Sequence, residues 1–244
     1  MKTIAVIPAR YAATRFPGKL MAQLGRKTVI RTTYENTVNT GLFDDVFVAT
    51  DSQIIYNEII SHGGKAIISK NTHQCGSDRI AEAVKDLDCE IIINVQGDEP
   101  FINKTPLEKL IKVYKADIKK EIAMGTLIQK IADESNIENP NCVKVAVDRN
   151  NFALYFSRSA IPYSSQGIPS KYYKHIGVYA FRKEALLKFA KLPMLQNEKA
   201  EKLEQLRFLE YGMKVKVVET SFVGIEIDIP EDLVKANAYL RKQW

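Results

Sequence analysis

Short apolar runs alternate with amphipathic segments along the first half of the chain. The runs are continuous and are bounded by polar or turn-forming residues, which is typical of parallel strands buried on both faces. Strands are expected at 4–7, 46–50, 66–68, 91–95 and 123–128, and helices at 28–40, 51–60, 77–87 and from Thr105 onward. This β-α-β order predicts a parallel sheet with helices on both faces and right-handed crossovers.

Capping residues mark the expected helix starts. Asp51 or Ser52 can cap the second helix, and Ser77 is placed to cap the third. The segment 105–108 combines a capping box with a proline at the first helical position. These signals support the helical reading of the amphipathic segments.

The pattern changes near residue 143. Two strands joined by a hairpin-like turn, a polar loop and a third strand follow one another without a helix between them. They lie at 143–147, 153–156, 161–174 and 175–181. We interpret residues 143–181 as a β-rich excursion that covers the open site or pairs with a second subunit.

Helices and strands then resume to the end of the chain. Helices are expected at 183–190, at 198–211 and from Pro230, and strands at 214–218 and 225–227. The whole pattern predicts one domain, residues 1–244, of the α/β class. Its sheet should be predominantly parallel and Rossmann-like, with the β-rich excursion inserted.

The charge balance is mildly basic, with 35 Lys and Arg against 29 Asp and Glu, and the sequence has no dense basic run. We therefore expect a local site for an anionic substrate and no nucleic-acid interface. Pro8 and Arg10 interrupt the first apolar segment early, so we expect a cytoplasmic protein without membrane insertion. Three cysteines, Cys75, Cys89 and Cys142, have no C-x-x-C spacing, which indicates neither a disulfide framework nor a zinc site.

Three cations follow the first expected strand: Arg10, Arg15 and Lys19. They suit a polyanion such as a triphosphate better than a single carboxylate, and Gly18 allows close backbone approach. The strand would deliver them to the edge where open α/β sheets bind ligands. The loop is neither a Walker A motif nor G-x-G-x-x-G, which disfavours a P-loop ATPase and an ordinary NAD enzyme. The alternative is a solvated basic loop beside a core strand.

Two aspartates stand at the ends of expected strands. Asp98 follows the most apolar strand, with Gly97 leaving room for a ligand, and Asp228 follows 225–227. Carboxylates there can hold Mg²⁺ against phosphate oxygens. Each aspartate alone is better explained as a turn or helix-cap residue. The cationic loop beside them favours a shared metal.

Nine segments, in this order and spanning residues 7–233, resemble the 3-deoxy-manno-octulosonate cytidylyltransferases, or CMP-Kdo synthetases. No single segment is decisive, but the set is highly specific. The segments are IPARY at 7–11, RFPGK at 15–19, VATD at 48–51, GSDR at 76–79, NVQGDEP at 94–100, ALYFSR at 153–158, HIGVY at 175–179, LEQLR at 203–207 and DIPEDL at 228–233.

The resemblance implies a sheet of the nucleotidyltransferase type and a reaction of CTP with 3-deoxy-D-manno-octulosonate (Kdo). This gives CMP-Kdo and pyrophosphate for lipopolysaccharide biosynthesis. Such a reaction needs positioning and charge neutralisation more than covalent catalysis. The resemblance also implies a homodimer with the excursion in its interface.

The resemblance assigns roles to residues of the nucleotide side. Lys19, Arg15 and Asp98 would be catalytic, with Lys19 stabilising charge on the α-phosphate. Asp98 and Asp228 would hold Mg²⁺, which could also lower the pKa of the attacking hydroxyl. The implied nucleotide-binding residues are Ala9, Arg10, Arg15, Lys19, Ser77 and Arg79.

The sugar acid would bind the second half of the site, with Arg158 pairing with its carboxylate. The implied sugar-binding residues are Gln96, Arg158, His175, Tyr179, Glu204 and Gln205. Without the resemblance, His175 would be a structural histidine and Tyr179 a core aromatic. On the helix expected at 198–211, Glu204 and Arg207 would then be solvated.

The sequence departs from the family pattern at several positions. Ala13 replaces a usual serine, Leu20-Met21 stands where Pro-Leu is common, and Cys75 occupies a position that is often serine. Glu226 adds a carboxylate near the expected sugar pocket and suggests 8-amino-3,8-dideoxy-manno-octulosonate as an alternative substrate.

Two other readings stay open. One is a cytidylyltransferase for another sugar acid, such as a sialic-acid-like nonulosonate. The other is a non-catalytic nucleotide-binding protein. The presence of Lys19 together with Asp98 and Asp228 disfavours it, because CTP sensing alone would not need a pair of metal-binding aspartates from distant parts of the sequence. A nucleic-acid module is weaker still, because the chain lacks an aromatic and basic face.

Overall fold

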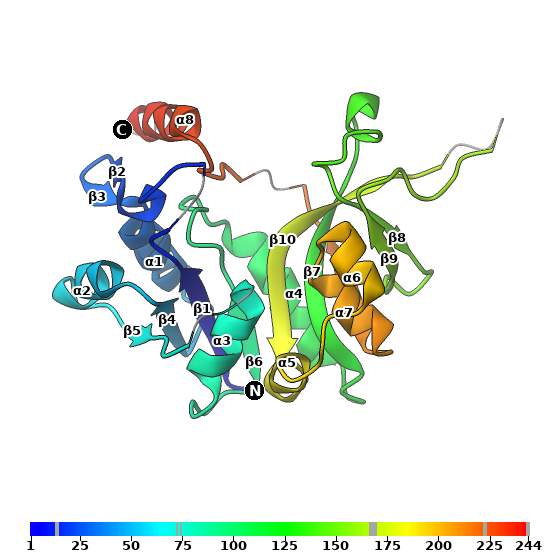
Figure 1. The fold of residues 1–244 in the computed structure, drawn as a ribbon, viewed down its shortest axis with the longest axis horizontal. Helices are drawn as coiled ribbons and strands as arrows, with labels where there is room; N and C mark the ends of the chain where they lie inside the picture. Colours follow the sequence, from blue (N-terminus) through cyan, green and yellow to red (C-terminus); the bar gives the residue numbers. More distant parts are fainter. Residues whose placement is uncertain (13–14, 72, 74, 166–169, 222–223, 243–244) are drawn as a thin grey trace. The chain divides into compact units, whose positions relative to one another are not determined.

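A computed structural model describes residues 1–244 except 13–14, 72, 74, 166–169, 222–223 and 243–244 (Figure 1). The chain divides into two compact units. The first combines residues 1–104 with 223–244, and the second comprises residues 105–222. The prediction of a single domain over residues 1–244 stays a prediction, and the expected excursion at 143–181 falls within the second unit.

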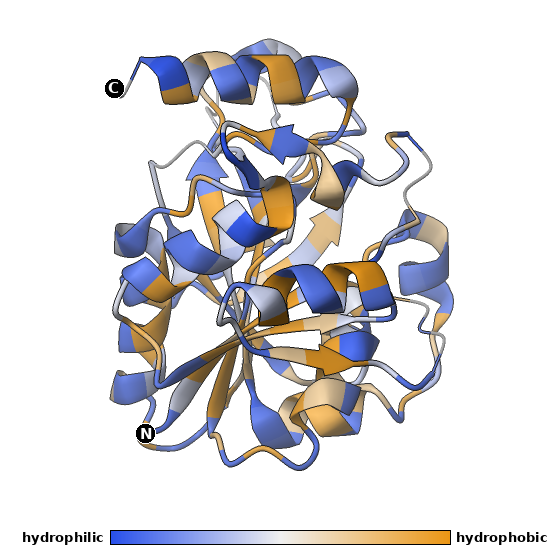
Figure 2. Cartoon of the chain, turned by 90° about the vertical axis from the view of Figure 1, so that its left-hand side faces the viewer, coloured by the Kyte–Doolittle hydropathy of each residue, from blue (hydrophilic) through white to orange (hydrophobic). Residues whose placement is uncertain are grey.

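The first unit is built on a parallel sheet. Its central strand β1 (Thr3–Ala9) pairs in parallel with β4 (Asp45–Thr50) on one side and β6 (Ile91–Asn94) on the other. Strand β5 (Ala66–Ile68) pairs in parallel with β4. Strands β1 and β6 are buried along nearly their whole length, as expected for strands covered on both faces, and Figure 2 shows strands of the structure largely in the hydrophobic colour. The four strands and their parallel pairing were predicted from the sequence and are confirmed.

The helices of the first unit begin close to the expected positions. Helix α1 (Val29–Asn39) is capped by Thr28, whose side chain accepts a hydrogen bond from the Arg31 backbone. Helix α2 (Gln53–Ser61) is capped by Ser52. Helix α8 (Pro230–Arg241) begins at the predicted proline.

Helix α3 (Gly76–Val84) begins two residues earlier than its predicted cap, Ser77, allows. Ser77 lies inside the first turn and is 1% exposed, so its assignment as the cap was wrong. Cys75 holds the cap position without a side-chain capping bond.

The segment 225–227 is not a strand, contrary to the prediction. It has no regular secondary structure, and the Ile227 backbone nitrogen donates to the carbonyl of Asp98 at 2.9 Å. The segment forms this one backbone hydrogen bond in place of the series expected between paired strands. The bond links the Asp98 loop to the residues that precede α8. Periodicity of apolar residues does not distinguish such a segment from a short buried strand.

Two small elements follow the first strand and were not predicted. Gly18 precedes a 3₁₀ turn, η1 (Lys19–Met21), and a hairpin of β2 (Gln23–Leu24) and β3 (Lys27–Thr28) leads into α1. Helix α8 lies beside this hairpin (Figure 1). The Gly25 backbone donates to Asn237 Oδ1 at 2.9 Å, so the C-terminal helix is joined to the start of the chain.

The second unit contains a mixed sheet. Strand β7 (Ile122–Lys130) pairs antiparallel with β10 (Tyr173–Arg182) and parallel with β11 (Lys214–Glu219). The predicted hairpin is present as β8 (Lys144–Val147) and β9 (Ala153–Ser157), and β8 also pairs with β10. The helices and turn of this unit are α4 (Lys104–Ala116), η2 (Glu134–Asn136), α5 (Lys183–Phe189), α6 (Gln196–Glu201) and α7 (Gln205–Glu210).

The helix predicted over 198–211 is two helices, and that prediction was wrong. The chain breaks at Lys202, which has a left-handed φ of 54°. Arg207, expected in solvent, is 4% exposed: its guanidinium donates to both carboxylate oxygens of Glu198 at 2.6 and 2.7 Å. It also lies 4.2 Å from the Phe189 ring centre. A bidentate partner and an aromatic face make this buried charge tolerable.

Candidate functional site

Lys19 occupies the centre of the candidate site. Its ammonium nitrogen donates to Asp98 Oδ2 at 2.6 Å and to Asp228 Oδ1 at 3.2 Å. Arg15 forms an ion pair with the other oxygen of Asp228. The side chains of Lys19, Asp98 and Asp228 are 14%, 18% and 23% exposed, whereas that of Arg15 is 71% exposed. The structure therefore brings the two predicted metal ligands together on one cation.

Local backbone structure delivers each of the three side chains. Gly18 has a φ of 70°, a conformation that L side chains rarely adopt, and this turn starts the 3₁₀ element that begins with Lys19. Asp98 lies in the loop after β6. Asp228 precedes α8, and its backbone nitrogen donates to Asp232 Oδ2 at 3.3 Å. Lys19 thus begins a 3₁₀ turn, Asp98 lies in a loop after a strand, and Asp228 lies just before a helix.

The electrostatics of the site are dominated by carboxyl groups. Burial alone would lower the pKa of Lys19, but attraction to Asp98 and then Asp228 outweighs it and raises that pKa above 10.5. Burial, followed by repulsion from Glu226 and Asp98, raises the pKa of Glu99 to about 7. Loss of water, followed by repulsion from Asp98 and Asp228, raises the pKa of Glu226. The crowded carboxyls therefore keep Lys19 protonated, and their mutual repulsion favours the neutral form of Glu99 and Glu226.

A cavity of about 470 Å³ opens beside Lys19. Among the predicted residues, its lining includes Ala9, Arg10, Arg15, Lys19, Arg79, Gln96, Asp98 and Asp228. Ser77 is buried and is not among the lining residues. The predicted phosphate, metal and base residues of the first unit thus share one cavity, with Ser77 as the exception.

Arg79 is held in the cavity wall by an ion pair. It is 6% exposed, and its Nη2 donates to Asp51 Oδ2 at 2.6 Å. Its Nη1 is buried and has no hydrogen-bond partner among the described residues. Arg79 therefore combines one paired nitrogen with one buried donor nitrogen that is unpaired within the described part of the chain, and it is among the residues that line the cavity.

His73 also lines the cavity and was missed by the sequence reasoning. Its Nε2 lies 2.9 Å from Ser69 Oγ and also contacts the carboxylate of Glu82. The signal that could have found it is its place in the polar segment before α3. Glu226 lines the cavity too, whereas the departure noted at Ala13 lies outside the described residues.

Five predicted sugar-binding residues lie in the second unit. His175 Nε2 is 2.9 Å from Thr126 Oγ1, and the His175 ring lies edge-on to Phe156 and tilted against Tyr179. Burial lowers the pKa of His175 to about 4. Tyr179 is 8% exposed and stacks on Phe181. These contacts are those of core residues, and a sugar-binding role stays a prediction for both.

The other three residues lie near the end of β9 and the start of α7. Arg158 donates through Nε to the carbonyl of Glu201 at 2.8 Å and through Nη1 to that of Pro140 at 3.0 Å. Gln205 is 1% exposed, and its Nε2 has no hydrogen-bond partner within the described ranges. Glu204 is half-buried at the start of α7. Their predicted roles toward a sugar are untested by these contacts.

None of the helices that the structure describes is long and apolar enough to cross a membrane. Residues 4–215 match the family described as Cytidylyltransferase. A 3-deoxy-manno-octulosonate cytidylyltransferase of Flavobacterium johnsoniae is 59% identical over 244 residues and is covered, like this chain, to 99%. One from Christiangramia forsetii is 55% identical, covering 98% of this chain and 97% of its own.

A solved structure described as CMP:2-keto-3-deoxy-manno-octonic acid synthetase complexed with CTP superposes with a TM-score of 0.94. It is 36% identical, and each chain is covered completely. This likeness confirms the predicted α/β fold of the nucleotidyltransferase type.

Proposed function

The chain belongs to the family of 3-deoxy-manno-octulosonate cytidylyltransferases and is therefore an enzyme, and we propose that it transfers CMP from CTP to the anomeric hydroxyl of Kdo. The products are CMP-Kdo and pyrophosphate. The observation that carries the proposal is the contact of Lys19 with both Asp98 and Asp228 in a cavity lined by further cations. The names of the relatives and the structure with CTP support the choice of sugar and nucleotide.

The reaction forms a bond from the anomeric oxygen of Kdo to the α-phosphorus of CTP. The bond from that phosphorus to the bridging oxygen of the β-phosphate breaks, pyrophosphate leaves with the electron pair, and the hydroxyl proton is released. Lys19 has three N–H donors, and two are used by Asp98 and Asp228, so one remains for an α-phosphate oxygen. Arg10 and Arg15 would bind the leaving phosphates. Rate enhancement then comes from positioning and charge neutralisation.

We propose Mg²⁺ as the cofactor, held by Asp98 and Asp228. The two carboxylates fit this ion because they converge on one cation and are hard oxygen donors. Within the described residues, no group of three or more His, Cys, Asp and Glu is arranged to hold a metal. That agrees with an ion that completes its coordination with phosphate and water. When bound, Mg²⁺ would neutralise phosphate charge and lower the pKa of the attacking hydroxyl.

The sugar side rests on the resemblance. We propose that Gln96, which lines the cavity, hydrogen-bonds a sugar hydroxyl, and that Arg158 pairs with the sugar carboxylate. We also propose sugar contacts for His175, Tyr179, Glu204 and Gln205.

An amino sugar is a second candidate substrate, and one observation favours it. Glu226 lines the cavity and would attract an ammonium group on 8-amino-3,8-dideoxy-manno-octulosonate. The Glu226→Gln variant should then lower kcat/KM for the amino sugar and leave that for Kdo unchanged. Equal effects on the two sugars would remove Glu226 from the account of specificity.

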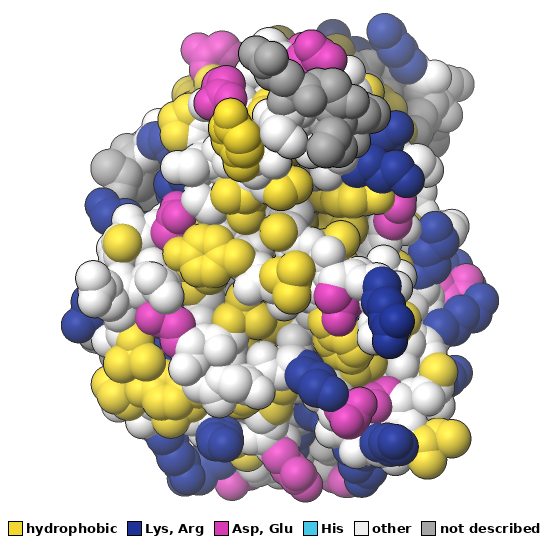
Figure 3. All heavy atoms as spheres, turned by 90° about the vertical axis from the view of Figure 1, so that its right-hand side faces the viewer, with side chains coloured by type: hydrophobic (Ala, Val, Ile, Leu, Met, Phe, Trp, Pro, Cys, Tyr) yellow, Lys and Arg dark blue, Asp and Glu magenta, His cyan; other side chains and the backbone are white. Residues whose placement is uncertain are grey.

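We propose that the enzyme works as a homodimer in the cytoplasm and supplies activated Kdo for lipopolysaccharide. Support for a dimer comes from Leu154 in β9, which is 62% exposed, and Tyr163, which is 90% exposed. Figure 3 shows hydrophobic side chains gathered on the side of the molecule to which β8 and β9 belong. Light scattering of wild type and Leu154→Glu tests this: a monomeric wild type would refute the dimer.

Pyrophosphate release tests the proposed function. Wild type is supplied with CTP, Mg²⁺ and Kdo, the amino sugar or a sialic acid, next to Asp98→Asn and the exposed control Asp88→Asn. We expect release with Kdo, a loss of about 100-fold or more in Asp98→Asn, and wild-type rates in the control. Release with the amino sugar alone would change the substrate and keep the mechanism. CTP binding without release for any sugar acid would refute the proposal.

A further inference from the structure

The loop that carries Asp98 is tied down through its main-chain carbonyls. Thr33 Oγ1 in α1 lies 2.9 Å from the Gly97 carbonyl, and Asn36 Nδ2, one turn further along, donates to the Pro100 carbonyl at 2.7 Å. The Ile227 backbone holds the carbonyl of Asp98 itself. Helix α1 therefore grips the loop on both sides of the carboxylate that faces Lys19.

The same helix backs the turn that carries Lys19. A Cβ atom at Gly97 would lie 3.3 Å from Ile30 Cδ1 in α1 and 3.4 Å from Leu20 Cδ1 in η1. It would also lie 3.2 Å from the Pro8 carbonyl. The space beside Gly97 is thus too tight for an ordinary side-chain contact, and the atoms that close it belong to α1, to the residue next to Lys19 and to the end of β1. The 2.6 Å contact between Lys19 and Asp98 spans two segments that share this one support.

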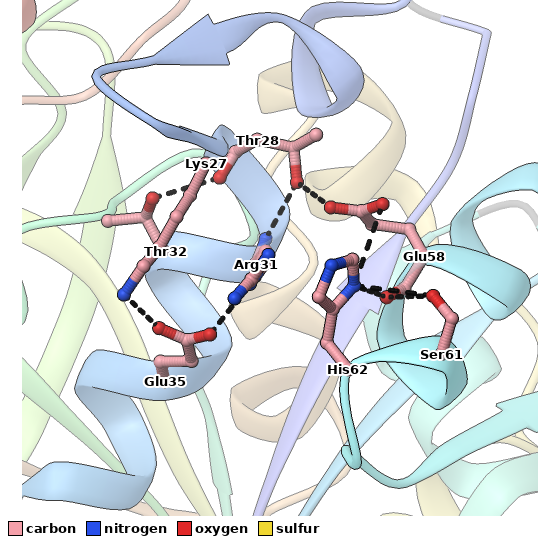
Figure 4. Close-up of polar contacts among 8 residues, drawn as sticks. All are labelled: Lys27, Thr28, Arg31, Thr32, Glu35, Glu58, Ser61 and His62. Carbon is pink, nitrogen blue, oxygen red and sulfur yellow. Dashed lines mark hydrogen bonds and ion pairs between the residues drawn. The ribbon is translucent and has the colours of Figure 1, made fainter.

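Helix α1 is itself fixed at its start. Figure 4 shows Thr28 accepting from the Arg31 backbone and donating to Glu58 Oε1 in α2 at 2.9 Å. About two turns beyond Thr28, the Glu35 carboxylate binds both Lys27 and Arg31. A helix joined in this way to α2 and to the preceding hairpin gives the Asp98 loop a rigid reference.

We propose that Thr33 is a positioning residue, with Asn36 as its second tether, and that it sets the Asp98 carboxylate in the geometry that Lys19 and the metal require. The inference rests on the proposed function. Thr33 is 0% exposed, and an ordinary helical threonine would be satisfied by the carbonyl four residues back, here Val29 at 3.0 Å. Thr33 shares its single proton with a carbonyl outside the helix, which a purely helical role does not need.

Helix α1 supplies a matched control. Thr37 is also 0% exposed, and its hydroxyl donates to the carbonyl four residues back, that of Thr33, at 2.7 Å. No hydrogen bond from its hydroxyl to the Asp98 loop is found in the described part of the chain. Thr33→Val and Thr37→Val therefore remove the same group from the same helix, and the first alone frees the Gly97 carbonyl.

The experiment measures CTP binding by calorimetry without any sugar acid, in EDTA and across a Mg²⁺ titration. Mg²⁺ is expected to tighten CTP binding, and in Thr33→Val the Mg²⁺ concentration that gives half of this effect should rise about 10-fold. Mutation of a residue that supports a metal ligand typically changes metal affinity by that order. Binding in EDTA should stay unchanged. Thr33→Ser should restore the wild-type value, and Thr37→Val should equal wild type. Pyrophosphate release is measured in parallel.

The outcomes separate this inference from the proposed function. Equal Mg²⁺ dependence in the two valine variants overturns the role of Thr33, whatever the activity. If the wild type releases no pyrophosphate but Thr33→Val still shifts the Mg²⁺ dependence of CTP binding, the proposed function is refuted and the positioning role of Thr33 is kept. If Thr33→Val does not fold, Asn36→Ala decides, with a shift in the same direction expected and an unchanged value overturning the inference. A wild type whose CTP binding does not depend on Mg²⁺ overturns the inference, and the pyrophosphate release measured in parallel decides the proposed function separately.

Discussion

The Lys19 ammonium binds two carboxylates that lie 79 and 209 residues away in the chain. With its pKa raised by those carboxylates, Lys19 is a permanent cation at neutral pH. A permanent cation suits the stabilisation of charge on a phosphate and does not suit proton transfer. The proposed mechanism therefore uses Lys19 electrostatically.

The Lys19→Met variant tests this role. Pyrophosphate release should fall by about 100-fold or more, because the donor aimed at the developing charge is lost. Asp98 and Asp228 would also lose the ammonium between them, which leaves Arg15 as the ion-pair partner of Asp228. Steady-state rates at saturating CTP measure the effect, with Lys112→Met, an exposed lysine on α4, as the control. Retained activity in a folded Lys19→Met protein would contradict the electrostatic role.

A second prediction at this scale concerns His175 and pH. Its folded pKa of about 4 lies below the ordinary 6.5, so between these values the unfolded chain binds the proton and the folded chain does not. The free energy of unfolding should therefore decrease as pH falls through this window, by at most about 1.4 kcal/mol per pH unit from this residue. Urea unfolding at pH 5, 6 and 7 should show a flatter profile for His175→Gln. Parallel profiles for the two proteins would mean that His175 is not the source.

At the scale of elements, local signals explain most helix ends and strands of the first unit. The exception in the second unit is the break between α6 and α7, where Lys202 adopts a left-handed conformation in a stretch with helical periodicity. The buried pair of Glu198 and Arg207 packs across that break. This ion pair is a tertiary contact, so the helical periodicity of the sequence could not predict it.

The connection from α2 to β5 yields a stability prediction. A Cβ at Gly64 would lie 2.6 Å from Ile59 Cγ2 and 3.0 Å from the Ile59 carbonyl, so neighbouring atoms must shift. Gly64→Ala should lower the free energy of unfolding by about 2 kcal/mol through overpacking. Gly63→Ala meets no atom within 4 Å but has a φ of 77°, so its cost should be about 1 kcal/mol. Denaturant unfolding gives both values, and the reverse order would contradict the packing described here.

At the scale of the whole molecule, the first unit is completed by the last residues of the chain. Residues 224–242 contact the N-terminal part of this unit at three points. Asp228 accepts a hydrogen bond from Lys19, the Ile227 backbone donates to the Asp98 carbonyl, and Asn237 accepts from the Gly25 backbone. The candidate site is therefore assembled only when both ends of the sequence have folded together.

Truncation tests this dependence. A chain ending at residue 222 should release no pyrophosphate above background, whereas one ending at residue 241 should keep wild-type activity. Asn237→Ala, which removes one contact of α8, should lower the free energy of unfolding by about 1 kcal/mol and reduce activity far less than truncation. Thermal unfolding and pyrophosphate release measure both effects. Full activity in the shorter chain would refute a role for Asp228.

The sequence by itself determined the strands of the parallel sheet, most helix starts, the cationic loop and the family to which the chain belongs. These features can be predicted from the local periodicity of apolar residues, from capping residues and from short motifs. Sequence reasoning also named Lys19, Asp98 and Asp228 as members of one site.

Only the tertiary structure decided how those residues meet. It showed one ammonium between two carboxylates, replaced a predicted strand at 225–227 by a single backbone bond, and buried Arg207 against Glu198. It also placed His73 and Glu226 in the cavity wall and Thr33 under the Asp98 loop. The physical reason is that hydrophobic periodicity reports which face of an element is buried. Which polar groups pair across the chain depends on contacts between residues far apart in sequence.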